Sequence, residues 1–288
     1  MNYSKAKVYL DGSHYIAIPS EKQSWKNRKK EINPKSELNE KIKEIFRQSE
    51  KKTQREKVKE AIQEINKEVG NIKKSTESVK SCLDKMTRNA IVRKTRLSRK
   101  VYLQEWNYFC TFTYDSNKLS EQEFRKKLSN CLKHLSSRKG WKYVGVWEKS
   151  PKNERLHFHG LFYTPQMVGE LVEKRDYSTT KHKMQVAVQN TFFLKRFGRN
   201  DFREIVKSDL SEAIIYMMKY IQKTGEKVVY SKGLPTYFVS DIIEQDVVCT
   251  IGQENRKLLL FDDFHCINDG EFIGKVDNSV IKKMPKTN

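Results

Sequence analysis

The apolar residues between positions 106 and 164 change their spacing twice, and this constrains the fold more than any other feature of the chain. "WNYFCTFTYD" (106–115) alternates and is rich in aromatic residues and threonine, which predicts a buried strand. "SEQEFRKKLSNCLKHLSSRKG" (120–140) has apolar residues at helical spacing, and "WKYVGVWE" (141–148) and "LHFHGLFYT" (156–164) predict two strands joined by a turn. We therefore expect an α+β fold, an antiparallel sheet of about five strands with helices packed on one face.

Two helices carry clear end signals. Ser120 and Glu123 form a capping box at the start of the first, and Asp209 is a suitable N-cap for a second helix over 209–224. Between them, residues 165–205 predict a short helix, a lysine-containing loop, and a strand pair or bulged strand in "FFLKRFGRNDFREI".

Basic residues are concentrated in the first third of the chain. The whole chain carries 57 Lys and Arg against 36 Asp and Glu, and residues 1–100 hold 27 of the first and 13 of the second. A hairpin signal around Asp11–Gly12 comes first, and two or three thin amphipathic helices follow after Pro34. These helices form either a solvated arm or an arm that follows DNA. The run "RNAIVRKTRLSRK" (88–100) favours the second, because its last eight residues include five cations that could meet phosphates.

The net charge of +21 makes a polyanion the natural partner, either nucleic acid or an anionic membrane surface. No stretch approaches the roughly 18 to 20 consecutive apolar residues that a membrane-spanning helix needs, and the first residues lack the apolar core of a signal peptide. The five cysteines are widely scattered and include no C-x-x-C pair, which argues against a disulfide framework and a cysteine zinc site. We therefore expect a cytoplasmic protein without a membrane partner.

Two histidines stand one residue apart in the strand predicted at 156–164. His157 and His159 point to the same face of that strand, and Phe158 between them points to the core. Glu148 ends the preceding strand, so the hairpin brings its carboxylate close to one of the imidazoles. The three side chains either bind a divalent cation or are two strand imidazoles beside a solvated strand end.

The helix predicted at 209–224 has two distinct faces. An apolar stripe contains Ala213, Ile214, Met217, Met218 and Ile221. The other side carries Tyr216, Lys219, Tyr220 and Lys223. The tyrosines either reach the surface past apolar neighbours or face a substrate.

Together the histidines and tyrosines describe a phosphoryl-transfer site. A neutral tyrosine hydroxyl, with an ordinary pKa of about 10, is a poor nucleophile. It needs a Lewis acid on the target phosphate and positive charge nearby to favour the phenolate. A metal held by the His-His-Glu set would supply the first, and Lys219 the second.

These motifs resemble those of the HUH endonuclease superfamily, which contains rolling-circle replication initiators, relaxases and single-strand transposases. "LHFHG" (156–160) resembles its H-hydrophobe-H motif, and "FCTFTYD" (109–115) resembles the first motif of the initiators. "YMMKY" (216–220) is similar to their third motif, with a second tyrosine one turn on as in the dual-tyrosine phage initiators, and "VVYSKGLP" (228–235) resembles a segment downstream of it. The resemblance covers about residues 105–240, with the motifs in initiator order.

The resemblance implies a role for each site residue. Glu148, His157 and His159 would bind Mg²⁺ or Mn²⁺, and Tyr216 would be the primary nucleophile. Lys219 would be its charge partner and Tyr220 a second nucleophile.

The resemblance also implies replication initiation. Such a protein nicks and rejoins single-stranded or hairpin origin DNA through a 5′-phosphotyrosine, and the released 3′ hydroxyl primes rolling-circle replication of a phage or plasmid. Since the chain lacks a G-x-x-x-x-G-K-[ST] motif, a host helicase and a DNA polymerase are the expected partners.

The alternatives are a single-strand transposase or mobilisation relaxase of the same superfamily, or a non-catalytic origin-binding protein. A relaxase normally has its tyrosine before the metal motif, and the transposases are compact one-tyrosine proteins, so the order and the two tyrosines here favour an initiator. The expected division is a basic N-terminal region (1–100), a nicking and joining domain (101–240), and a C-terminal extension (241–288).

Overall fold

The computed structural model describes residues 2–20, 35–49, 52–150, 155–178, 182–224, 227–252 and 257–287. Contacts along the chain divide it into two units. The first unit joins residues 1–20 to residues 94–288, and the second comprises residues 21–93.

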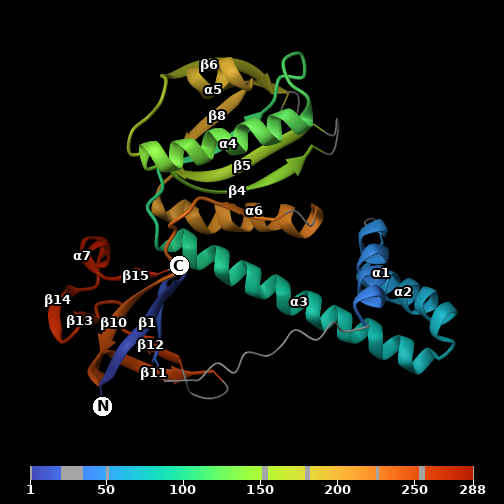
Figure 1. Ribbon diagram of the computed structural model, residues 1–288, viewed down its shortest axis with the longest axis horizontal. Coiled ribbons are helices and arrows are strands. Elements are labelled where there is room, and N and C mark those ends of the chain that lie inside the picture. The colour runs from blue at the N-terminus through green and yellow to red at the C-terminus, as the bar shows by residue number, and fades with distance from the viewer. Residues whose placement is uncertain are drawn as a thin grey trace. The chain divides into compact units, whose positions relative to one another are not determined.

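The first unit contains the expected five-stranded antiparallel sheet, which confirms the predicted α+β class (Figure 1). Its strand order is β8-β3-β5-β4-β9, so the two strands of the predicted hairpin, β4 and β5, are neighbours near its centre. These strands are β3 (Tyr108–Thr113), β4 (Lys142–Lys149), β5 (Leu156–Tyr163), β8 (Asn200–Glu204) and β9 (Val229–Tyr230).

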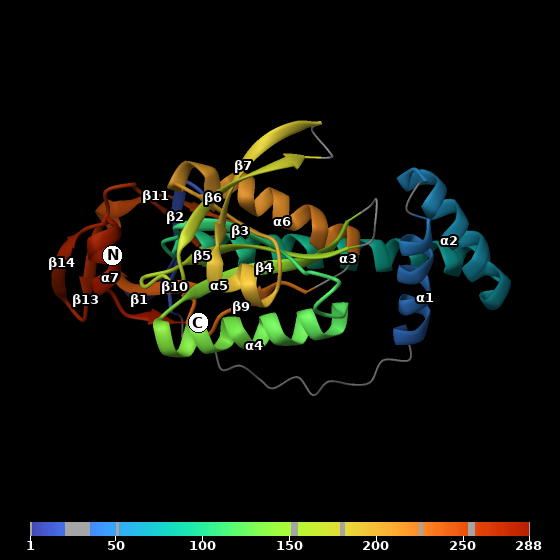
Figure 2. The ribbon, with the colours of Figure 1, turned by 90° about the horizontal axis from the view of Figure 1, so that it is seen from above.

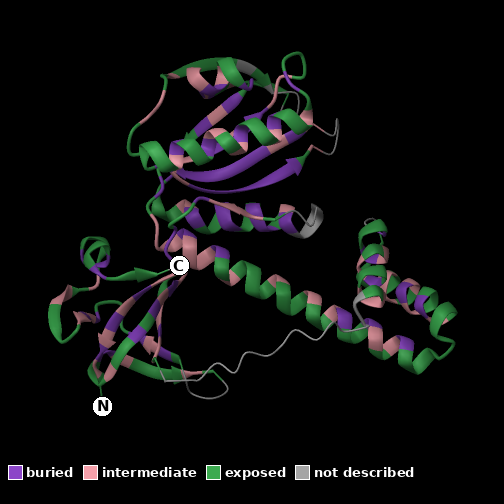
Figure 3. Ribbon diagram, in the orientation of Figure 1, coloured by how far each residue is buried: buried purple, intermediate pink, exposed green. Residues whose placement is uncertain are grey.

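Helices cover both faces of this sheet, so the expectation of helices on one face was wrong. Helix α4 (Glu121–Lys139) packs against Phe158 and its neighbours on one face, whereas α6 (Leu210–Thr224) packs against Leu161 on the other (Figure 2). The physical reason lies in β4 and β5, which are buried along nearly their whole length (Figure 3). A strand that is apolar on both faces needs cover on both.

The end signals of α4 act as predicted. Ser120 and Glu123 form the capping box, and Gly140 adopts a left-handed conformation (φ +69°) just after the helix. The four apolar side chains of α4 that point to the sheet are buried: Phe124, Leu128, Leu132 and Leu135.

Residues 165–205 differ from the prediction. They form a two-stranded hairpin, β6 (Leu171–Ser178) and β7 (Lys183–Asn190), then helix α5 (Thr191–Arg196) where a strand was expected. Asn190 explains the helix, because its side chain accepts hydrogen bonds from the backbone N–H groups of the second and third residues of α5. Strand β8 is the expected strand of this segment.

The N-terminal hairpin and the C-terminal residues form a second sheet within the first unit. Strands β1 (Tyr3–Asp11) and β2 (His14–Ile18) confirm the predicted hairpin, with Gly12 at φ +76° in its loop. Because β1 pairs with β10 and β2 with β12, segments expected in separate regions of the chain share one sheet. The remaining elements are β10 (Tyr237–Ile242), a 3₁₀ turn (Glu244–Asp246), β11 (Val247–Ile251), β12 (Lys257–Leu260), β13 (His265–Asn268), β14 (Glu271–Lys275), α7 (Asn278–Lys283) and β15 (Lys286–Thr287).

The second unit consists of the predicted amphipathic helices and has a small core of its own. Helices α1 (Lys35–Gln48), α2 (Gln54–Val69) and the first part of α3 (Ile72–Tyr102) contribute to it. The buried side chains of this core are Ile42, Phe46, Ala61, Ile65, Val79 and Cys82. None of the helices in the described part of the chain combines the length and the apolar character that crossing a membrane requires.

Candidate active site

The ladder between β4 and β5 brings the three predicted metal-site residues together. Glu148 pairs with His157 across the ladder, and its Oε2 atom lies 2.8 Å from Nε2 of His159. The two imidazole rings are 5.8 Å apart, centroid to centroid. Glu148 and His159 are buried, with 8% and 7% of their surface exposed, and His157 is half-buried.

Two threonines of β3 hold the histidines from the neighbouring strand. Thr111 Oγ1 lies 3.0 Å from Nδ1 of His159, and Thr113 Oγ1 lies 2.8 Å from Nδ1 of His157. Each threonine is also the ladder partner of its histidine. Neither threonine is predicted as a site residue from the sequence, in which this strand indicates only part of the core, although "TFT" and "HFH" have the same alternation.

The donors fit a divalent cation in their chemistry. Two imidazole nitrogens and a carboxylate oxygen suit Mn²⁺, and the carboxylate also suits Mg²⁺. Adjacent ligands of an octahedral ion at about 2.1 Å are roughly 3 Å apart, which is close to the 2.8 Å between Glu148 and His159. Among the described residues, however, no three His, Cys, Asp or Glu side chains converge closely enough to form a ready-made metal cluster.

His157 is kept neutral by its surroundings. Burial is the largest cause that lowers its pKa, to about 4, and the charges of His159, Arg155 and Arg199 act in the same direction. The nearby Glu148 opposes this shift. A neutral imidazole has a lone pair to offer a cation throughout the physiological pH range.

Both predicted tyrosines lie over the histidine strand. The ring of Tyr216 is 5.5 Å from that of His159 and 5.6 Å from that of Phe109, and the ring of Tyr220 stacks 5.9 Å from His159. The tyrosine rings are 4.8 Å apart, and Tyr216 keeps 36% of its surface exposed. The sequence predicts a face away from the core for both, whereas Tyr220 packs against the apolar cluster under α6 and Tyr216 contacts Phe109 and His159 of the sheet.

The protein alone does not favour a phenolate at this site. Burial is the largest cause that raises the pKa of Tyr216 and of Tyr220, and the Glu148 carboxylate adds to both shifts. The neighbouring Tyr220 is a further cause that raises the pKa of Tyr216. Positive charge from elsewhere is therefore needed to make either tyrosine a good nucleophile.

The predicted charge partner, Lys219, is exposed on α6 one residue before Tyr220. It makes no hydrogen bond or ion pair to any residue that the structure describes. The side chain of Lys223 lies outside the described residues.

One comparison with known proteins bears on this site. Residues 107–225 match the model of a family of replication-associated proteins of the ORF2 type. The matched range covers about two fifths of the chain and contains every predicted site residue, from Glu148 to Tyr220. No curated protein and no solved structure matches the chain. The family match supports a role of this segment in the initiation of replication.

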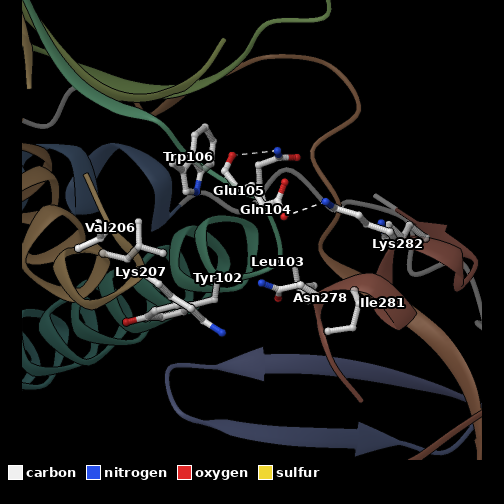
Figure 4. A pocket seen from close by; sticks show the side chains of 12 residues that line it. Tyr102, Leu103, Gln104, Glu105, Trp106, Val206, Lys207, Asn278, Ile281 and Lys282 are labelled. Carbon is white, nitrogen blue, oxygen red and sulfur yellow. Dashed lines mark hydrogen bonds and ion pairs between the residues drawn. The ribbon is translucent and has the colours of Figure 1, made fainter. Parts of the chain in front are cut away.

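A cavity of about 190 Å³ near the start of α6 contains none of the predicted site residues. Figure 4 shows Trp106 and Val206 on its walls and a dashed line between Lys282 and Glu105. That line is an ion pair, in which Lys282 Nζ lies 2.9 Å from Glu105 Oε1. The predicted site residues instead lie on the face of the sheet that α6 covers.

Two cations of the basic run at 88–100 make hydrogen bonds to other parts of the first unit. Arg99 makes two hydrogen bonds of 2.8 and 3.0 Å to the carboxylate of Asp11, and its guanidinium lies 4.0 Å from the ring centre of Tyr9. Lys100 donates to the carbonyl oxygen of Leu234 at 3.0 Å, and burial lowers its pKa. Two of the five cations expected to meet phosphates therefore have partners within the protein, and the contact of the run with phosphates stays a prediction.

Proposed function

We propose that the chain is a replication initiation protein that nicks and rejoins single-stranded origin DNA through a covalent 5′-phosphotyrosine. One observation carries the proposal. The ring of Tyr216, on α6, lies 5.5 Å from that of His159, on β5, although the two residues are far apart in the sequence. A nucleophile beside a histidine pair and a carboxylate is the arrangement that metal-assisted phosphoryl transfer requires. The family match over the same residues and the resemblance to the HUH endonucleases support this interpretation.

Each residue has a part in the proposed reaction. Glu148, His157 and His159 hold Mg²⁺ or Mn²⁺, which when bound supplies a Lewis acid for the target phosphate. Thr111 and Thr113 orient the two imidazoles by hydrogen bonds to Nδ1.

The bond changes balance without an external energy source. The Tyr216 oxygen bonds to phosphorus, the bond from phosphorus to the 3′ oxygen breaks, and the 3′ oxygen takes up a proton. The Tyr216 phenol gives up its proton to solvent, to which 36% of the residue's surface is exposed. Rejoining is the reverse attack of a 3′ hydroxyl on the phosphotyrosine, so it needs no ATP.

Lys219 and Tyr220 have separate roles in this proposal. Lys219 lies three residues after Tyr216 on α6, which puts the two on neighbouring turns of the same helix side. Its charge stabilises the phosphate and the phenolate. Tyr220 serves as a second nucleophile in later rounds of strand transfer. A host helicase opens the duplex and a DNA polymerase extends the 3′ end.

The test is the formation of a covalent adduct. The full chain is incubated with overlapping single-stranded oligonucleotides that tile the DNA around its gene, with Mn²⁺ or with EDTA, and the products are separated on a denaturing gel. We expect one oligonucleotide to give a protein–DNA adduct with Mn²⁺ and none to do so with EDTA. The absence of an adduct with every oligonucleotide, with either Mg²⁺ or Mn²⁺, would contradict the proposal.

A further inference from the structure

An open cavity of about 440 Å³ lies at the carboxyl end of β3, apart from the cavity of Figure 4. Its walls come from the loop after β3, the residue before β5, helix α5 and the segment before β8. The wall residues that matter here are Thr113, Tyr114, Lys118, Arg155, Lys195 and Arg199.

This cavity adjoins the histidine pair. Thr113 belongs to its wall, and the hydroxyl of Thr113 lies 2.8 Å from Nδ1 of His157. Arg155, also in the wall, stands two residues before His157 in the chain. The cavity and the histidine pair therefore meet at Thr113.

The lining of the cavity is strongly positive. Among the described residues that line it are the four cations Lys118, Arg155, Lys195 and Arg199 and one acidic residue, Asp115, whose carboxylate lies 3.5 Å from Lys118. Arg155 donates to the hydroxyl of Ser116 at 3.4 Å, and its guanidinium has further N–H groups with which to donate. The excess of cations selects an anionic ligand.

The backbone of the cavity is held in place by hydrogen bonds. Thr113 N donates to the carbonyl oxygen of Arg199, and Asp115 N donates to that of Phe197, both at 2.8 Å. Gly198 has φ +116°, and a Cβ atom there would lie 2.7 Å from Asp115 N. Only glycine allows the two segments to approach this closely, so the cavity is formed before any ligand arrives.

The cavity also offers apolar surface for a base or sugar. One face of the Tyr114 ring stacks 5.4 Å from Phe124 of the core, and Leu194 of α5 contributes an aliphatic wall. The volume lies within the range of about 300–1,000 Å³ that is typical of sites for small ligands. Cations for a phosphate beside an aromatic side chain are the usual composition of a site for single-stranded nucleic acid.

We propose that this cavity binds one nucleotide of the single-stranded DNA, next to the phosphate at the histidine pair. Arg155 and Lys195 contact the backbone phosphate of that nucleotide, and Tyr114 contacts its sugar or base. The identity of the ligand as DNA rests on the proposed function, whereas the site itself is defined by the cavity and its charges.

The test measures binding without cleavage. Fluorescein-labelled hexathymidylate is titrated with the full chain in EDTA at several salt concentrations, and the affinity is read from fluorescence anisotropy. For single strands, the slope of log affinity against log salt falls by about 0.7 for each phosphate that the protein no longer neutralises. We expect the double variant Arg155→Gln/Lys195→Gln to lower the slope by about 0.7, because both side chains contact the same phosphate.

The matched control is Lys133→Gln/Arg138→Gln, which removes one lysine and one arginine from the exposed side of α4. We expect it to leave the slope unchanged. An unchanged slope in the cavity variant, or an equal fall in the control, overturns the inference. Tighter binding of free dTMP than of hexathymidylate, abolished in the cavity variant, also overturns it in favour of a site for free nucleotides.

The outcome is separable from that of the adduct test. If the cavity variant lowers the slope but no adduct ever forms, DNA binding by the cavity is supported and the proposed nicking activity is contradicted. If adducts form normally and the slope does not change, the nicking activity is supported and DNA binding by the cavity is contradicted.

Discussion

Glu148 Oε2 lies 2.8 Å from Nε2 of His159, although the ladder sets Glu148 directly opposite His157. The carboxylate can only accept, so without a cation Nε2 of His159 donates to it, and Nδ1 lies 3.0 Å from the Thr111 hydroxyl. A cation on Nε2 would require a ring proton to be on Nδ1, where the same hydroxyl can accept it. The pair is thus arranged so that either state of His159 keeps its hydrogen bond to β3.

Removing the charge of Glu148 tests its place among the ligands. We expect Glu148→Gln to weaken Mn²⁺ binding at least about tenfold, because the amide keeps the shape but is a poorer ligand for a divalent ion. Isothermal titration with Mn²⁺ measures this. The control is Glu121→Gln. In the parent chain the carboxylate of Glu121 pairs with Lys149 at 3.2 Å and not with a histidine. Equal affinities for all three proteins would exclude Glu148 as a ligand.

The threonines of β3 are predicted to act through the histidines. Valine has the same shape without the hydroxyl, so Thr113→Val frees the Nδ1 atom of His157. The loss of such an orienting partner typically lowers metal affinity about 10–100-fold. We expect this range for Mn²⁺ in the same titration, with little change in the thermal midpoint of the metal-free protein. An unchanged affinity would show that Thr113 has only a structural role in β3 and does not orient His157 for metal binding.

The stability of the metal-free protein should depend on His157 at acidic pH. Its pKa is about 4 in the folded chain and 6.5 ordinarily, so between these values the unfolded chain binds a proton that the folded chain does not. The free energy of unfolding therefore falls as the pH drops from 6.5 toward 4.

The variant His157→Gln removes this contribution and keeps a hydrogen-bonding side chain beside Thr113. Thermal midpoints in EDTA at about pH 7 and about pH 4.5, which lie on either side of the ordinary histidine pKa, should differ less for the variant than for the parent chain. A pH dependence that is equally steep in both proteins would rule out His157 as its source.

Arg99 is predicted to matter for stability and not for DNA binding. Its side chain is 16% exposed and makes the double hydrogen bond to Asp11. We expect Arg99→Ala to lower the free energy of unfolding by about 1–3 kcal/mol, because a largely buried carboxylate loses its partner. Arg93→Ala, at an exposed position of the same helix, is the control and should change it by less than about 0.5 kcal/mol. Urea denaturation compares them, and equal losses would contradict the assignment.

Local signals in the sequence were enough for α4 and for the metal strand. The signals for α4 all lie within that one helix, so the structure confirms them. They are the capping box of Ser120 and Glu123 and the spacing of Phe124, Leu128 and Leu132. The alternation of His157 and His159 likewise determines which face of β5 they share.

Long-range pairing was not visible in the sequence. Nothing in residues 3–18 indicates that they pair with β10 and β12, which lie near the other end of the chain. The helix α5 was missed because the Asn190 cap outweighs the strand propensity of the aromatic residues after it. The contact of Tyr216 with His159 depends on how α6 crosses the sheet, which the helical spacing alone does not determine.

The most direct measurement of the central claim is the identity of the tyrosine that carries the DNA. The adduct assay is repeated with Tyr216→Phe, Tyr220→Phe and the double variant, and the parent adduct is digested and its phosphotyrosine peptide identified by mass spectrometry. We predict that Tyr216→Phe abolishes the adduct, that Tyr220→Phe retains it, and that the modified peptide contains Tyr216. An undiminished adduct in the double variant would contradict the account.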